Sequence, residues 1–120
     1  MEYSEDFVDK VWNKGVIIDG YDSNLIRQDA CGAWILKEAY SKENNDFSWG
    51  IEMVMPISMG GDDNLDNLRP MNTKNIQSKA NSYPEYYSAL QADGSNNVEV
   101  RVLHVVNEDL QKRLKQIYNK

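Results

Sequence analysis

The segment that decides the fold runs from Trp49 to Met71 and reads WGIEMVMPISMGGDDNLDNLRPM. Its apolar first part ends at Pro56, which indicates a short extended segment. The pair Gly60-Gly61 is followed by polar residues and is a strong turn signal, after which apolar residues return at the spacing of a short structured segment. Asn72 has a side chain that caps helices, so we expect a helix from there to about Asn81.

A helix is also expected before this segment. Ser4 is a suitable N-cap because two acidic residues follow it directly. Apolar residues then recur on one helical stripe, which consists of Phe7, Val8, Val11 and Trp12. Gly15 ends this N-terminal helix.

The residues that follow Asn81 are rich in tyrosine. Ser82 and Glu85 form a capping-box pair around Pro84, which predicts a short helix that ends near Asp93. Its aromatic residues are Tyr83, Tyr86 and Tyr87. They have rings that stack on nucleobases, but the sequence places no basic groove beside them, so a core or interface role is the better interpretation.

A strand and a helix are predicted at the C-terminal end, over about residues 97–119. Valine alternates with charged residues in a pattern that predicts a strand from about Val98 to Val106. Asn107 then starts a terminal helix, in which basic residues face outward. The residues expected to face inward are Leu110, Leu114, Ile117 and Tyr118.

The composition fits a single α+β domain over residues 1–120. The chain is 41% hydrophobic and 27% charged, which lets it bury a modest core. It has neither an apolar run that would span a membrane nor a signal peptide, so we expect a soluble, intracellular (cytoplasmic) protein without a membrane partner. The single cysteine, Cys31, makes neither an internal disulfide nor, by itself, a structural zinc site.

The charge is negative overall but unevenly distributed. The formal net charge of −6 argues against diffuse binding to the phosphates of nucleic acid. The stretch from Asn67 to Ser82, however, contains Arg69, Lys74 and Lys79 and no acidic residue. These cations form either a local nucleic-acid-binding face or an ordinary solvated surface.

The quoted segment and its continuation to Asn81 resemble the core of the HNH endonucleases. In that family a strand with an acid-His pair precedes a proline, a Gly-Gly turn, an Asn-Leu pair and a helix that carries Asn and Lys. The upstream residues are similar to one bacterial and viral subgroup, so the likeness spans about Val11 to Asn81. The resemblance implies a ββα-metal core at about 48–81, with flanking helices and an additional strand. Its hairpin would pair Ile51–Val54 with Leu68–Met71.

The resemblance also assigns roles, and two of them fall on unsuitable residues. Glu52 occupies the position of the acidic metal ligand, and its oxygens suit Mg²⁺ or Mn²⁺. Met53 stands where the family has its histidine base, and a thioether accepts no proton near neutral pH. Ile76 stands where the metal-binding asparagine is expected, and Asn75, one position earlier, should point away from Glu52. We therefore expect no catalytic residue and no metal, with Glu52 as the residual candidate ligand.

Two functions follow from this resemblance. The first is a catalytically inactive HNH-like domain that acts as a binding or structural module. Its partner would be DNA, bound weakly through Arg69, Lys74 and Lys79, or a protein, including a second copy of the chain. The alternative is a nuclease that depends on Mg²⁺ or Mn²⁺ and combines Glu52 with Asp62 or Asp66.

Overall fold

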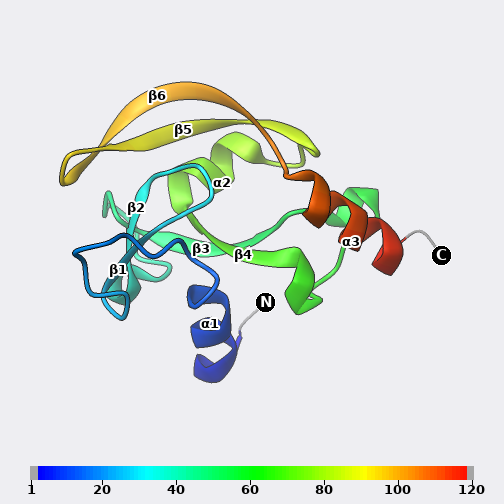
Figure 1. Ribbon diagram of the computed structural model, residues 1–120, viewed down its shortest axis with the longest axis horizontal. Coiled ribbons are helices and arrows are strands. Elements are labelled where there is room, and N and C mark those ends of the chain that lie inside the picture. The colour runs from blue at the N-terminus through cyan, green and yellow to red at the C-terminus, as the bar shows by residue number, and fades with distance from the viewer. Residues whose placement is uncertain (1–2, 119–120) are drawn as a thin grey trace.

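In the computed structural model, which describes residues 3–118, three α-helices combine with three separate two-stranded antiparallel sheets (Figure 1). This confirms the predicted α+β class. The elements in chain order are α1 (Glu5–Trp12), β1 (Ile26–Gln28), β2 (Trp34–Leu36), β3 (Trp49–Met53), β4 (Leu68–Asn72), α2 (Thr73–Lys79), β5 (Glu85–Asp93), β6 (Asn96–Val105) and α3 (Glu108–Tyr118). Within residues 3–118 no helix is both long enough and apolar enough to cross a membrane.

The central segment folds as the β3–β4 hairpin followed by α2. The hairpin expected for Ile51–Val54 and Leu68–Met71 is present, but its first strand starts earlier, at Trp49, and ends at Met53. Trp49 pairs with Asn72 at one end of the hairpin, and Glu52 pairs with Arg69 near the other. The connecting loop requires its glycine pair, because a Cβ at Gly61 would lie 1.8 Å from the carbonyl oxygen of Met55. The side chain of Asn72 accepts a hydrogen bond from the backbone N–H of Lys74 and caps α2, which ends at Lys79, two residues before the predicted end.

The segment 85–93 is a strand, and the predicted tyrosine-rich helix is wrong. Tyr86, Ser88 and Leu90 are buried while Glu85 and Tyr87 are exposed, which is the two-residue period of a strand. β5 pairs with β6, and its inner face packs on α2 (Figure 1). This non-local pairing outweighs the local capping signal of Ser82 and Glu85. The predicted C-terminal strand and helix are confirmed as β6 and α3.

Two apolar clusters hold these elements together. One joins α1 to β2, β3 and β4, and it consists of Val11, Trp12, Ile35, Trp49 and Leu68. The other lies between the hairpin, β5 and α3, and it consists of Cys31, Val54, Met55, Met71, Tyr86, Val106 and Leu114. In this second cluster Leu114 is fully buried, so α3 is fixed against the body of the protein.

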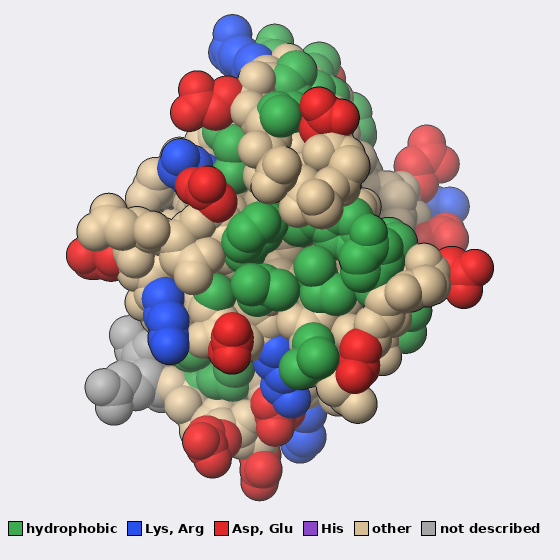
Figure 2. Space-filling model, turned by 90° about the vertical axis from the view of Figure 1, so that its left-hand side faces the viewer, with side chains coloured by type: hydrophobic (Ala, Val, Ile, Leu, Met, Phe, Trp, Pro, Cys, Tyr) green, Lys and Arg blue, Asp and Glu red, His purple; other side chains and the backbone are tan. Residues whose placement is uncertain are grey.

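One side of the molecule carries an apolar surface. Figure 2 looks onto the side that carries β1, β2 and the turn between β5 and β6, and hydrophobic side chains gather in its middle, with charged ones around them. Exposed apolar side chains also occur in the segment that leads into β1, where Ile17 and Leu25 have exposed fractions of 61% and 62%. A patch of this kind on a surface is typical of a contact site.

Candidate functional site

The centre of the candidate site is the carboxylate of Glu52, which lies on β3 and is buried. Arg69, opposite on β4, donates a hydrogen bond from Nε to Oε1 over 2.5 Å. The Nζ of Lys79, from the last turn of α2, lies 3.3 Å from Oε2. One carboxylate therefore faces two cations, and the cluster has a net positive charge if all three groups are ionised.

Both cations are anchored by further contacts. The Nζ of Lys79 donates to the carbonyl oxygens of Met53 and Val54, at 3.3 and 2.9 Å, and only 1% of its side chain is exposed. Burial lowers the pKa of Lys79, and the charge of Glu52 opposes that effect. Arg69 donates from Nη2 to the hydroxyl of Tyr86 over 3.1 Å. The two side chains thus have defined partners inside the protein.

The three cations predicted to contact DNA therefore do not form one exposed surface. Arg69 and Lys79 turn inward to Glu52, with side-chain exposures of 14% and 1%. Lys74 is exposed on α2. Two of the three cations of the acid-free stretch thus form ion pairs with Glu52 of the neighbouring strand β3. Of the three, only Lys74 is exposed to solvent.

The side chains at positions 53 and 76, where the resemblance expects a histidine and an asparagine, line a small and mostly apolar hollow. Met53 and Ile76 border a space of about 180 Å³ beside Glu52. The other lining residues are Ile51, Pro56, Ile57, Ala80 and Asn81. Thioether and alkyl groups are poor ligands for a hard cation such as Mg²⁺.

Asn75 points away from Glu52, as its position on the helix predicts. Its Oδ1 accepts hydrogen bonds from the backbone N–H groups of Ala89 and Leu90, both at 2.8 Å. Its Nδ2 donates to Asp29 over 3.1 Å. The side chain therefore joins α2 to β5 and is unavailable as a substitute ligand.

The acidic residues of the loop after β3 remain apart from Glu52 in their contacts. Asp62 and Asp66 are exposed. Asp62 accepts a hydrogen bond of 2.6 Å from the hydroxyl of Tyr118, which lowers the pKa of Asp62. Across residues 3–118 there is no group of three or more His, Cys, Asp or Glu side chains arranged to hold a metal ion.

Sequence reasoning missed Asp29, which organises the interior behind the hairpin. Its Oδ1 accepts from the backbone N–H groups of Cys31 and Ala33, both at 2.9 Å. Its Oδ2 accepts from the backbone N–H of Asn72 at 2.9 Å and from Asn75. The one local signal is Gly32, which has a φ of +86° and closes the turn that starts at Asp29.

Cys31 gives a pH-dependent prediction. Burial raises the pKa of its thiol from 9.0 to about 12, and the charge of Asp29 adds to the rise. Because the pKa is higher in the folded state, the thiol's stabilisation is complete below about pH 9 and is lost as the pH rises toward about 12. We expect this group to lower the free energy of unfolding by about 1.4 kcal/mol between pH 8 and 10. Urea denaturation of the wild type and of Cys31→Ala at both pH values measures it, and equal pH dependence in the two proteins would contradict it.

The site thus consists of a buried ion cluster beside an apolar hollow. The cluster links β3, β4 and α2 through two ion pairs that share the buried carboxylate of Glu52. Its Oε1 accepts a hydrogen bond from Arg69, whereas its Oε2 is buried without a hydrogen-bond partner and has only the charge of Lys79 beside it. Such a centre stabilises a fold more readily than it activates water. Comparisons of the chain with protein-family models, curated proteins and solved structures found no significant match.

Proposed function

We propose that this protein is a catalytically inactive HNH-type domain that acts as a binding or structural module. The observation that carries the proposal is the burial of Glu52 between Arg69 and Lys79. This carboxylate occupies the position at which the resemblance expects a metal ligand. A dication that bound there would compete with two anchored cations and would meet their repulsion.

The neighbouring positions support the same conclusion. Hydrolysis of a phosphodiester at a single metal needs a base for the attacking water and ligands that hold the metal. Met53 offers no proton acceptor, and Ile76 offers no oxygen or nitrogen. Both side chains border an apolar hollow, where a hydrated cation would gain little.

The alternative, a nuclease with other ligands, has weaker support. It requires Glu52 to leave its two cations and to meet Asp62 or Asp66 around one ion. Asp62 is already engaged by the hydroxyl of Tyr118, and both aspartates are exposed on the loop that follows β3. The weight of these contacts favours an inactive domain.

A cleavage assay and a metal titration together test the proposal. We expect no nicking of supercoiled plasmid with Mg²⁺, Mn²⁺ or Zn²⁺ at neutral pH, and no heat of binding when Mn²⁺ is titrated into the protein. Metal-dependent nicking that disappears in Glu52→Gln and also in Asp62→Asn or Asp66→Asn would establish the alternative. The aspartate variants matter because they leave the buried cluster intact.

The partner of the module is a separate question. A protein partner or a second copy would find an apolar surface on the side shown in Figure 2. A nucleic acid would need exposed cations, and Arg69 and Lys79 do not supply them. A surface that contacts a nucleic acid therefore has to be formed by other exposed lysines or arginines.

A further inference from the structure

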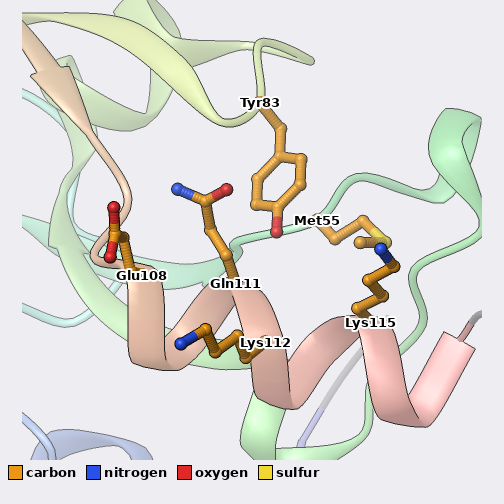
Figure 3. Close-up of a pocket in the computed structure, with 6 residues that line it drawn as sticks. All are labelled: Met55, Tyr83, Glu108, Gln111, Lys112 and Lys115. Carbon is orange, nitrogen blue, oxygen red and sulfur yellow. The ribbon is translucent and has the colours of Figure 1, made fainter.

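A groove lies between α3 and the chain that leads into β5. It is open to solvent and has a volume of about 550 Å³, within the range of about 300–1,000 Å³ that is common for ligand sites. Figure 3 shows the ring of Tyr83 above α3, with Gln111 on one side of it and Met55 on the other, Lys115 reaching toward Met55 and Lys112 below. The lining residues are Met55, Tyr83, Glu108, Gln111, Lys112 and Lys115.

Two lysines of this groove form no ion pair within the described part of the protein. They are Lys112 and Lys115, which are one helical turn apart and exposed. Lys14, by contrast, donates to the carbonyl oxygens of Leu65 and Leu68. Against the two lysines the groove has one acid, Glu108, so its net charge is positive in a protein whose formal net charge is −6.

The same groove has an aromatic wall and a fixed acceptor. Tyr83 is partly buried and packs against the cluster that contains Met55, which holds its ring in place. Gln111 donates from Nε2 to the carbonyl oxygen of Val106 over 2.6 Å. Its Oε1 is thereby positioned to accept a hydrogen bond, and in Figure 3 this oxygen lies on the side of Tyr83.

We infer that this groove binds single-stranded nucleic acid, with one base stacked on Tyr83 and the adjoining phosphates on Lys112 and Lys115. The inference rests on the proposed binding role and names its ligand class. Stacking on a tyrosine requires an unpaired base, which excludes a duplex as the direct ligand. An acidic peptide would satisfy the lysines, but it would leave the aromatic wall and the acceptor of Gln111 without a specific use.

Salt dependence gives the first test. We expect labelled oligo(dC) to bind weakly at low salt in an anisotropy titration, because the overall negative charge opposes approach. The plot of log affinity against log salt should have a slope of about −1.4, from two contacts at about −0.7 each for a single strand.

A matched pair of variants locates the contact. Lys112→Gln combined with Lys115→Gln should reduce affinity at low salt at least tenfold and bring the slope close to zero. Lys10→Gln combined with Lys42→Gln makes the same change of charge at exposed positions outside the groove, and it should leave affinity within about twofold and the slope unchanged. Tyr83→Leu keeps an apolar side chain but removes the ring, and it should lower affinity about fivefold or more. Circular dichroism confirms that each variant is folded.

The outcomes separate this inference from the proposed function. Three results would overturn the inference. The first is no oligonucleotide binding at low salt, and the second is binding that the groove variants leave unchanged. The third is displacement of the probe by a glutamate-rich peptide that binds the groove with equal affinity. Cytidine monophosphate, titrated in parallel, shows whether the ligand is a free nucleotide or a strand. Tighter binding of the oligonucleotide supports a strand as the ligand, whereas equal affinity would mean that the groove binds a free nucleotide. Plasmid nicking with metal would overturn inactivity alone, because it does not involve the lysines of α3.

Discussion

Glu52→Gln is expected to lower the free energy of unfolding by about 3–5 kcal/mol. The substitution keeps the shape of the side chain and removes the charge that compensates Arg69 and Lys79. Lys79 has only 1% of its side chain exposed, so water cannot replace the lost carboxylate. Urea denaturation followed by far-ultraviolet circular dichroism measures the change. Glu43→Gln, in an exposed loop, is the matched control and should stay within about 0.5 kcal/mol of the wild type.

The sign of this effect discriminates between the two functions. A carboxylate kept for metal chemistry is often strained, and its replacement then leaves stability unchanged or raises it. Replacement of a carboxylate that pairs with two cations inside the protein lowers stability instead. The double variant Glu52→Gln with Lys79→Met should be less destabilised than the sum of its single variants, because it removes one of the stranded charges. A stabilised Glu52→Gln protein would favour the nuclease alternative.

Local signals predict the loop and the helix of the central segment. The glycine pair forms the loop, and Asn72 caps α2, because both depend on backbone conformation and short-range hydrogen bonds. The tyrosine-rich segment was mispredicted for a different reason. Its capping pattern is also local, but β5 takes its structure from β6, and a strand of that kind depends on a partner that the pattern does not include.

The site could be predicted only in part. The positions of Glu52, Met53 and Ile76 follow from their order along the chain, and the structure places all three around one hollow. Arg69 faces Glu52 because of the register of the hairpin, and Lys79 reaches it because α2 ends beside β3. Neither ion pair can be recognised in the sequence, because each joins residues that lie far apart along the chain. The groove beside Tyr83 was missed because its lysines come from α3, some thirty residues later in the chain.

Asp29→Ala is expected to lower the free energy of unfolding by about 4 kcal/mol or more, because four hydrogen bonds to its carboxylate are lost and three buried backbone donors keep no other acceptor. Three of the donors are backbone N–H groups, those of Cys31, Ala33 and Asn72, and the fourth is the side-chain amide of Asn75. Each buried donor left without a partner costs about 1–3 kcal/mol. Asp19→Ala, in an exposed turn, removes the same group without these contacts and should change stability by less than about 0.5 kcal/mol.

Hydrogen exchange then shows whether Asp29 acts as the link between the turn, β4 and α2. The amide of Asn72 should lose protection in Asp29→Asn, a variant that keeps an acceptor oxygen and is therefore expected to remain folded. The amides of β6 that pair with β5 should keep theirs, because that ladder does not include Asp29. Uniform loss of protection across all strands would mean that Asp29 supports only global stability. A selective loss of protection at Asn72 would mean that Asp29 connects the hairpin to α2, as its hydrogen bonds indicate. This connection holds the hairpin against the helix, and it thereby brings Glu52 and Lys79 together.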